Sequence, residues 1–410
     1  MDSLTFLHIA DLHLDSPFSG LTNLPSNIFK RAQNSTFTSF TRLINIAIEQ
    51  KVDFVIIAGD LFDGEDRSLR AQSRFRREME RLHEHEIEAF VIHGNHDHLG
   101  GNWPYFEWPS NVHVFQNEDV DVITYLKNGD TVANIYGFSY TKKAVIENKT
   151  TSYEKKGEAP FHIGILHGSK EGESAHSRYA PFLLSELQQK GFDYWALGHI
   201  HTREVLSEDP PIIYPGNIQG RHKKETGEKG GYLVKLSKAQ ANYTFFPTAD
   251  LIWENTTIDI SELTSFDQLV DISLSHLNLL RKENQGLFVT IEYSGTGPLH
   301  NQLQENAIKE DLLSVLNDDL DRNNFVYVVG FKQNIQFEIN REKLKEDSHF
   351  IGDLLEKMET YGDFEQALLP LRNHQSFRRY IDSFTKEELK EILHDAESII
   401  LRELYYSNRR

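Results

Sequence analysis

Histidine, aspartate and asparagine recur in this sequence in short groups, each directly after an apolar run. The groups are Asp11-Leu-His13, Gly59-Asp60-Leu-Phe-Asp63, Gly94-Asn95-His96-Asp97, His167 and Gly198-His199-Ile-His201. Imidazole nitrogen combined with carboxylate and amide oxygen suits manganese, iron or zinc, and it is too rich in nitrogen for calcium or a purely magnesium site. Because the chain has no cysteine, thiolate ligands and disulfides are excluded.

The apolar runs before these groups predict buried strands. They cover residues 4–10, 54–58, 89–93, 161–166 and 194–197. The run at 54–58 is Phe-Val-Ile-Ile-Ala, with no polar alternation, which is typical of a strand buried on both faces of a parallel sheet. The carboxyl ends of such strands meet at one edge of the sheet, where open α/β sheets hold their ligands. We therefore expect the polar groups to converge in space.

The number of candidate ligands indicates two metal ions. The candidates are Asp11, His13, Asp60, Asn95, His167, His199 and His201. One ion does not need seven protein ligands, whereas two ions that share a carboxylate could use them all, with Asp60 as the natural bridge. A two-metal site about 3.5–4 Å across clamps the attacking and leaving oxygens of a displacement at phosphorus. The pattern thus predicts a phosphoester hydrolase.

The order of the five motifs resembles that of the calcineurin-like metallophosphoesterases, and no motif has lost a ligand. The resemblance implies two divalent ions, manganese first, with iron or zinc as alternatives. It implies that the first ion is held by Asp11, His13, Asp60 and His201, and the second by Asp60, Asn95, His167 and His199.

Two catalytic residues follow from the same resemblance. His96 occupies the position of a histidine that faces the substrate phosphate without binding metal, and Asp63 that of a carboxylate that orients this histidine. A protonated His96 would stabilise charge on the phosphorane and assist departure of the 3′ oxygen after in-line attack by water.

Substrate contacts are predicted on one helix and one loop. Residues 26–50 and 68–84 have helical periodicity, with Phe29 among the inward-facing residues of the first. Arginines line one face of the second helix, at positions 67, 70, 74, 77 and 81. Two interpretations stay open: a solvated face paired with glutamates, or contact of Arg67 and Arg70 with a phosphate backbone. Arg221 and Lys223, on a glycine-rich loop after the last ligands, are further candidates.

Composition limits the function classes. The net charge of −19 argues against a nucleic-acid coat or a membrane-surface protein, and it predicts that any binding to DNA is weak, salt-sensitive or aided by a partner. No apolar run of 18 residues exists, and the first residues lack the basic region of a signal peptide. We expect a cytoplasmic protein that does not span a membrane.

The 410 residues are long enough for several domains. The expected fold class is α/β. Residues 1–250 form a two-sheet metallophosphoesterase sandwich flanked by helices, 251–345 a small α/β capping domain, and 346–410 a C-terminal helical segment. The candidate catalytic residues all lie in the first of these domains.

The layout narrows the resemblance within the superfamily. Small phosphodiesterases and Ser/Thr phosphatases end near the last sheet, and the phosphatases carry an arginine where this chain has Gly64. A phosphoesterase domain with a small cap and a helical tail resembles the SbcD-type DNA repair exonucleases, and the opening Ala-Asp-Leu-His-Leu-Asp-Ser-Pro resembles their YhaO branch. This implies a manganese-dependent exonuclease acting on DNA ends in double-strand break repair. It also implies an SbcC-like ABC-type coiled-coil ATPase docked on the helical tail, and a homodimer.

Two other functions remain open from the sequence. A phosphodiesterase of nucleotides or other small phosphodiesters would use the same metal ligands. A non-catalytic scaffold with the phosphoesterase fold is the second alternative, although such scaffolds tend to lose ligands and this chain has kept all seven.

Overall fold

The computed structural model describes residues 3–16, 18, 24–63, 68–101, 106–172, 179–295, 299–303, 305–318, 324–335 and 349–360, with the single residues 367, 370, 393, 396 and 400. The predicted DNA contact Arg67 and most of the predicted helical segment 346–410 lie outside these residues. The chain divides into two compact units. The first comprises 1–256, 273–291 and 313–331, and the second comprises 257–272, 292–312 and 332–410.

The first unit contains a six-stranded sheet built around the predicted strand at 54–58. Its order is β12 (Ala241–Pro247), β11 (Gly230–Ser237), β1 (Ser3–Ile9), β2 (Phe54–Ala58), β3 (Glu88–Ile92) and β4 (Val112–Val114). Strands β1 to β4 run parallel, whereas β11 and β12 are antiparallel to their neighbours. The three candidate groups after β1, β2 and β3 therefore leave the same edge of one sheet.

A second six-stranded sheet carries the remaining candidate ligands. Its order is β5 (Asp121–Lys127), β6 (Asp130–Gly137), β7 (Phe161–His167), β8 (Tyr194–Gly198), β10 (Pro211–Tyr214) and β9 (Glu204–Glu208). The four inner strands are parallel to one another. His167 ends β7, and His199 and His201 follow β8, so both sheets deliver histidines from the ends of parallel strands.

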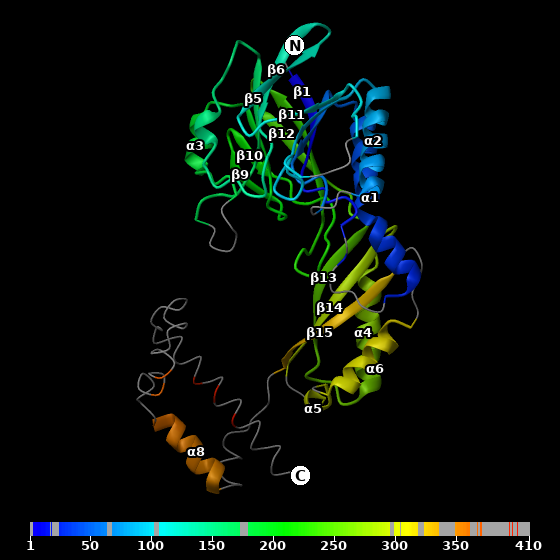
Figure 1. The fold of residues 1–410 in the computed structure, drawn as a ribbon. Coiled ribbons are helices and arrows are strands. Elements are labelled where there is room, and N and C mark those ends of the chain that lie inside the picture. The colour runs from blue at the N-terminus through cyan, green and yellow to red at the C-terminus, as the bar shows by residue number, and fades with distance from the viewer. Residues whose placement is uncertain are drawn as a thin grey trace. The chain divides into compact units, whose positions relative to one another are not determined.

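Apolar packing fixes these elements as layers (Figure 1). One buried cluster lies between the sheets and includes Phe6, Phe54 and Ile163. A second fills the other face of the first sheet beneath α1 (Ser26–Glu49) and α2 (Leu69–Glu84). A third covers the outer face of the second sheet, where the 3-10 turn Thr150–Ser152 and α3 (Leu184–Gln189) lie. The predicted α/β sandwich of two sheets flanked by helices is confirmed.

His8, on β1, shows how a titratable group fits into the layer between the sheets. Its Nε2 donates to the carbonyl of Leu197 at 3.2 Å, which leaves Nδ1 to accept from the Tyr194 hydroxyl at 2.9 Å. Because the ring is fully buried, its pKa is lowered to about 3. His8 is therefore a neutral core histidine that joins β1 to β8, as expected for a histidine outside the five motifs.

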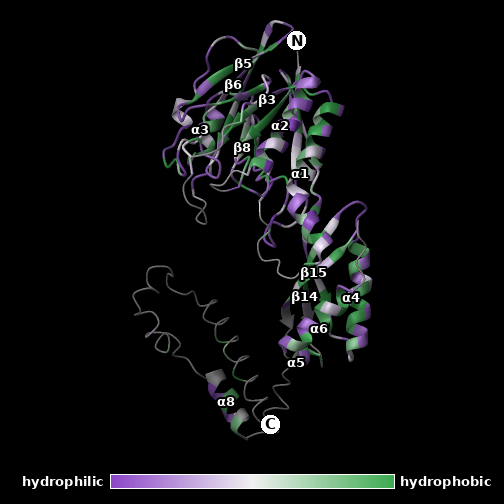
Figure 2. Cartoon of the chain, turned by 45° about the vertical axis from the view of Figure 1, so that its right-hand side comes forward, coloured by the Kyte–Doolittle hydropathy of each residue, from purple (hydrophilic) through white to green (hydrophobic). Residues whose placement is uncertain are grey.

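Figure 2 shows α1 and α2 with hydrophobic and hydrophilic bands on opposite sides, as their amphipathic sequences predict. Ser68 caps α2, because its hydroxyl accepts the amide hydrogen of Ala71 at 2.9 Å. The prediction that Phe29 faces inward is wrong, since this side chain is 44% exposed. At this end of α1 the buried positions are Ile28 and Ala32, which pack on Trp253, and Phe29 is rotated about 100° away from Ile28.

A third sheet of three strands follows the sandwich in the sequence. Its order is β13 (Leu251–Asp259), β14 (Gly286–Gly295) and β15 (Val326–Ile335). The helices that the structure describes in this part are α4 (Phe266–Leu280), α5 (His300–Leu303), α6 (Asn306–Leu316) and α8 (His349–Thr360). Among the described residues, no helix combines the length and apolar composition that crossing a bilayer requires.

Candidate metal centre

The loops after β1 and β2 run side by side beyond the end of the sheet. The amide of Asp11 donates to the carbonyl of Gly59 at 3.1 Å, and the amide of His13 donates to the carbonyl of Asp60 at 3.0 Å. The parallel pairing thus continues past the strands, and it brings two of the predicted motifs together through their backbones. The aspartate side chains are oriented by other amides. His96 N–H donates to Asp60 at 2.9 Å, and His199 N–H donates to both oxygens of Asp11 at 3.1 Å.

Four candidate ligands have left-handed backbone. The φ angles are 51° at Asp11, 41° at His13, 50° at Asp60 and 97° at His199. A positive φ is uncommon for residues with a side chain and costs about 1–3 kcal/mol where it is enforced. Strained backbone gathers at functional sites when the surrounding fold can hold it. Here the four strained residues follow the ends of β1, β2 and β8, at the edge where the candidate ligands converge.

Glycines allow the two sheets to meet at this edge. A Cβ on Gly198, at the end of β8, would lie 1.8 Å from the carbonyl oxygen of Ala58 at the end of β2. A Cβ on Gly94 would lie 2.4 Å from Oδ1 of Asp60 and 2.6 Å from Nε2 of His167. Any larger residue at either position would push the sheets or the ligands apart. The glycines of the Gly-Asn-His-Asp and Gly-His-Ile-His motifs are therefore required for the close approach of the two sheets and the ligands.

The first predicted ligand set converges on two facing imidazoles. Nε2 of His13 lies 3.1 Å from Nε2 of His201. Oδ2 of Asp60 lies 3.8 Å from Nε2 of His13, and Oδ1 of Asp11 lies 4.0 Å from Nε2 of His201. Asp11, His13 and Asp60 are buried, and His201 is one-quarter exposed.

The second predicted set lies around the Asn95 side chain. Its Oδ1 is 3.1 Å from Nε2 of His167 and 3.2 Å from Nδ1 of His199. Oδ2 of Asp60 lies 3.4 Å from the same nitrogen of His167. Asp60 therefore approaches both sets, as a bridging carboxylate would. The structure brings all seven predicted ligands to one edge of the sandwich.

The chemistry of these donors fits metal ions. Glu225 and Asp63 face the other ring nitrogens of His201 and His13, so the two Nε2 atoms present lone pairs to one another at 3.1 Å. Two nitrogen ligands about 2.1 Å from one ion and at right angles to each other lie about 3.0 Å apart. Such a close pair of acceptors repels unless a cation lies between them.

The pKa shifts of His167 and Asp60, in the second ligand set, also indicate a site that favours positive charge. Burial works against a charged His167, yet Asp60 and Asp11 raise the pKa of this ring to about 9. Burial would likewise raise the pKa of Asp60, but His167 and His13 hold it well below the usual range. The negative charge of Asp60 and Asp11 thus favours a cation at Nε2 of His167. The atoms that face this nitrogen are the oxygens of Asn95 and Asp60, which can bind such a cation. The residues present fit the two divalent ions that the resemblance implies.

His201 is held by a carboxylate that none of the sequence motifs indicates. Its Nδ1–H donates to Oε1 of Glu225 at 2.6 Å, and the other oxygen of Glu225 accepts the amide hydrogen of Arg221 at 2.6 Å. Burial opposes ionisation of Glu225, but His201 and Arg221 keep its pKa well below the usual range. A buried Lys229 donates to the carbonyl of His201 at 2.8 Å. Ring and backbone of this candidate ligand are therefore both fixed.

The end of β7 has its own supports. Nδ1 of His167 donates to the carbonyl of Ala58 at 2.9 Å, which directs Nε2 toward Asn95. The carbonyl of His167 accepts from the Tyr140 hydroxyl at 2.9 Å, and the carbonyl of Gly168 accepts from the Tyr214 hydroxyl at 2.6 Å. These buried tyrosines satisfy backbone oxygens that leave the sheet ladder, so His167 is held rigidly.

Asp63 links the predicted catalytic histidine to the metal ligands. Its Oδ1 lies 3.2 Å from Nδ1 of His96 and 3.3 Å from Nδ1 of His13. Its Oδ2 accepts from the Ser16 hydroxyl at 2.6 Å and lies 3.1 Å from Nη1 of Arg221. The Asp63 carboxylate raises the pKa of His96, whose ring is 41% exposed. His96 is thus oriented, favoured in its protonated form and open to a substrate.

Asp97, the last residue of its motif, organises the loops beneath the site. Its carboxylate is completely buried and accepts hydrogen bonds from the amides of Leu61 at 3.0 Å and Gly94 at 2.8 Å. It also lies 2.8 Å from Nδ1 of His93. Asp97 therefore joins the loop after β2 to the loop after β3.

The other predicted substrate contacts lie in different surroundings. Arg221 is only 13% exposed, and besides Asp63 it reaches the Ser16 hydroxyl at 3.1 Å. Lys223 is exposed on the same loop. Arg70, 44% exposed, pairs with Asp15 at 3.0 Å and with Asn34 at 2.6 Å. Contact of these residues with a substrate stays a prediction.

Comparison with known proteins agrees with the fold. A model of the calcineurin-like phosphoesterases matches residues 4–203. This chain belongs to the calcineurin-like metallophosphoesterases, a family that binds divalent metal ions. Within that class it is similar to the metallophosphoesterase YhaO of Bacillus subtilis, with 41% identity over 98% of each chain. A model of the YhaO middle domain matches residues 253–325.

More distant relatives carry a DNA repair name. The DNA double-strand break repair protein Mre11 of Sulfurisphaera tokodaii is 30% identical over 58% of this chain and 61% of its own length. The protein of the same name from Sulfolobus acidocaldarius is 24% identical over 73% of this chain and 77% of its own length. The predicted family is confirmed, and the alignment with the second of these repair proteins is longer than the region that the phosphoesterase model matches.

Proposed function

We propose that this chain is a two-metal phosphodiesterase that acts as an exonuclease on DNA ends. The observation that carries the proposal is the convergence of seven metal-type ligands beside an oriented, partly exposed His96. Asp60 approaches both ligand sets. A single metal would leave part of this donor set without a cation. A pair matches the requirement of displacement at phosphorus.

In this proposal the first ion is held by Asp11, His13, Asp60 and His201, and the second by Asp60, Asn95, His167 and His199. Bound there, two divalent ions, manganese in the first instance, would polarise the phosphate oxygens and acidify a water. The strained backbone and the carboxylate partner of His201 fix the donors before the ions arrive, so little reorganisation accompanies binding.

His96 acts on the leaving group. Its Nδ1–H faces Asp63, so Nε2 is the atom available to substrate. As water adds to phosphorus and the bond to the 3′ oxygen breaks, the proton on Nε2 passes to that oxygen. The Asp63 carboxylate stabilises the ring while it is protonated, and Ser16 and Arg221 hold the carboxylate in place.

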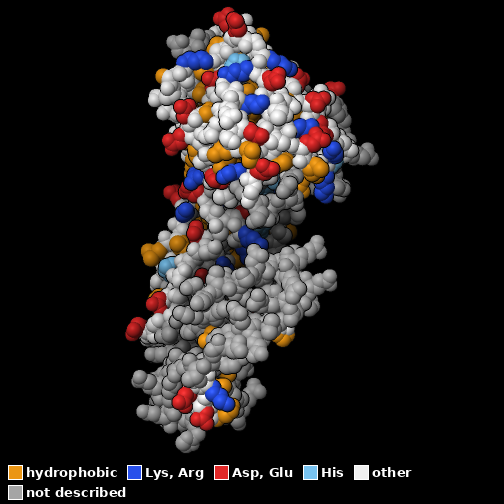
Figure 3. All heavy atoms as spheres, turned by 90° about the vertical axis from the view of Figure 1, so that its left-hand side faces the viewer, with side chains coloured by type: hydrophobic (Ala, Val, Ile, Leu, Met, Phe, Trp, Pro, Cys, Tyr) orange, Lys and Arg blue, Asp and Glu red, His pale blue; other side chains and the backbone are white. Residues whose placement is uncertain are grey.

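DNA as substrate is supported by the relatives named for double-strand break repair. The face drawn in Figure 3 mixes Lys and Arg with Asp and Glu over its described part, without one continuous basic surface. With a net charge of −19, affinity for DNA must come from local contacts or from a partner. We propose an SbcC-like ABC-type ATPase as that partner, docked on the segment 346–410, and a homodimer of the nuclease.

The test is degradation of end-labelled linear duplex DNA by the purified protein with manganese, magnesium or a chelator. Wild type is compared with His96→Ala at equal metal content. We expect manganese-dependent shortening that the variant lacks, with the label giving the polarity. Shortening by both proteins alike would remove His96 from the mechanism.

A second substrate tests the catalytic site independently of its proposed action on DNA. If the metal-loaded protein cleaves bis-p-nitrophenyl phosphate but does not shorten DNA, either alone or with the ATPase, the site is a working phosphodiesterase for smaller molecules and the exonuclease proposal fails. If it cleaves neither substrate, the catalytic assignment itself fails.

A further inference from the structure

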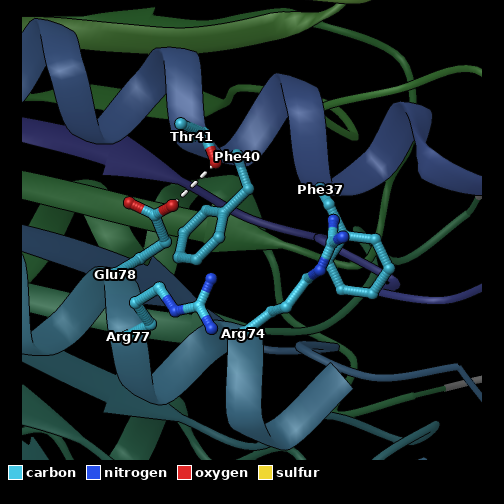
Figure 4. A pocket seen from close by; sticks show the side chains of 6 residues that line it. All are labelled: Phe37, Phe40, Thr41, Arg74, Arg77 and Glu78. Atoms are coloured by element: carbon cyan, nitrogen blue, oxygen red, sulfur yellow. Dashed lines mark hydrogen bonds between the residues drawn. The ribbon is translucent and has the colours of Figure 1, made fainter. Parts of the chain in front are cut away.

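A small pocket lies between α1 and α2, and none of the candidate metal ligands lines it. Its volume is about 240 Å³, and its lining residues are Phe37, Phe40, Thr41, Arg74, Arg77 and Glu78. Figure 4 shows Phe37, Phe40 and Thr41 coming from α1, and Arg74, Arg77 and Glu78 coming from α2. Neither the proposed mechanism nor the family motifs use these residues.

The pocket has more positive than negative charge. Glu78 is already engaged, because it accepts from the Thr41 hydroxyl at 2.7 Å and pairs with Arg81 at 2.5 Å. Within the part of the chain that the structure describes, neither Arg74 nor Arg77 has a carboxylate within ion-pair distance. Burial lowers the pKa of Arg74, and the nearby Arg70 and Arg77 lower it further. An anion between these guanidinium groups would relieve that repulsion.

Aromatic packing holds Arg74 in position. Its guanidinium lies over the ring of Phe37, 4.6 Å from the centroid, and Phe37 is only 3% exposed. On the other side of the pocket, Phe40 is stacked on Phe75 with centroids 5.7 Å apart. A guanidinium stacked on an aromatic face keeps its in-plane N–H groups free for a planar or tetrahedral oxyanion. The arginine is therefore pre-organised for a phosphate group.

The position of the pocket on α2 indicates which phosphate group of a substrate it binds. Arg74 lies about 8 Å along the helix axis from Leu69, where α2 begins after the Asp60–Asp63 loop. A strand whose scissile phosphate lay at the metals could reach it with a phosphate further along its backbone. Arg70 lies one turn closer to the start of the helix, on the same face.

We propose that the pocket formed by Phe37, Arg74 and Arg77 binds a backbone phosphate of the DNA substrate at a distance from the scissile bond. This rests on the proposed function and names a contact that none of the five motifs contains. Because the contact is the same before and during reaction, it contributes to KM and leaves kcat unchanged.

The experiment measures binding separately from cleavage. Metal-loaded wild type, Arg74→Gln, Arg77→Gln and Arg76→Gln are titrated with a fluorescent duplex whose phosphorothioate backbone resists hydrolysis, at several salt concentrations. Arg76 is the matched control, since it lies on α2, is 46% exposed and pairs with Glu80 at 2.9 Å. Its replacement changes the net charge equally.

We expect Arg74→Gln and Arg77→Gln each to weaken binding and to reduce the slope of log K against log salt by about 0.9, the value for one lost phosphate contact with duplex DNA. Arg76→Gln should keep the wild-type slope. Equal slopes in all four proteins, or no binding by wild type at low salt, would overturn the proposal.

Cleavage of ordinary DNA then separates the two proposals. If wild type cleaves DNA and Arg74→Gln has the same KM, the pocket proposal fails and the exonuclease proposal stands. If Arg74 and Arg77 control binding but wild type cleaves no DNA with or without the ATPase, the pocket stands and the exonuclease proposal fails.

Discussion

Replacing Glu225 by glutamine tests whether the carboxylate behind His201 is part of the metal centre. The glutamate oxygens accept two hydrogen bonds, from His201 Nδ1 and from the amide of Arg221, each at 2.6 Å. Glutamine has one carbonyl oxygen, so one donor would face its NH₂ group instead. An unpaired buried donor costs about 1–3 kcal/mol. Loss of the negative charge also makes the imidazole a weaker donor to a metal.

The expected loss is confined to one of two ions. Replacing an outer partner of a ligating histidine lowers metal affinity by about 10- to 100-fold, which is about 1.4–2.8 kcal/mol. Manganese titration of metal-free Glu225→Gln should therefore give one weakened site, the one that includes His201. The site that includes Asn95 and His167 should keep its wild-type affinity.

The matched control is Glu228→Gln, which removes the same charge from an exposed position on the same loop. Calorimetric titration resolves the two sites, and a thermal melt of each metal-free variant checks folding. Equal affinity at both sites in Glu225→Gln and wild type would refute the role of Glu225. So would an equal loss in Glu228→Gln, since that would be an effect of net charge alone.

Three further predictions follow from the geometry. Asp60→Ala should lose bound metal and activity together, whereas His96→Ala should keep its metal and lose turnover; metal analysis that finds the His96 variant empty would contradict this division. Arg221→Gln should lower kcat about tenfold or more without raising KM for bis-p-nitrophenyl phosphate, since Arg221 anchors Asp63; a raised KM with normal kcat would indicate substrate contact instead. His8 stays neutral in the fold to about pH 3 but takes up a proton near pH 6.5 when unfolded, so stability falls by about 1.4 kcal/mol per pH unit below pH 6.5. Urea unfolding of His8→Gln between pH 4 and 6 should lack that slope, and an unchanged slope would refute it.

The strand ends of the site were predictable because each ligand group follows an apolar run. A β-strand with both faces buried has a strong sequence signature, a continuous run of apolar residues. Parallel pairing then places the carboxyl ends of β1, β2 and β3 at one edge of the sheet. The meeting of the two sheets was predictable only through the family resemblance. What brings Gly198 against Ala58 is a contact between sheets, and no local pattern encodes it.

The supports of the ligands were not predictable in the same way. Glu225 lies among basic residues in the glycine-rich loop and belongs to none of the five motifs. Only the rule that a ligating histidine needs a partner on its second nitrogen indicates that some carboxylate is present, and it does not say which one. Arg221 was identified as a cation near the site, but its burial against Asp63 depends on how that loop folds. The error at Phe29 has a similar origin, because Ile28 and Phe29 fit the helical period equally well.

The pairing of β1 with β11 delays completion of the first sheet during protein synthesis. The register joins Ser3 to Ser237 and His8 to Tyr232, so the first strand synthesised meets one of its two neighbours more than 220 residues later. At about 5–20 residues per second, translation takes roughly 10–50 s to cover that interval. His201 and Glu225 also emerge only near its end. A ribosome-bound chain that stops before residue 199 has Asp11, Asp60 and Asn95 but lacks β11, His199 and His201. The complete set of candidate ligands, together with β11 and the carboxylate behind His201, is therefore present only after more than half of the 410 residues have been synthesised.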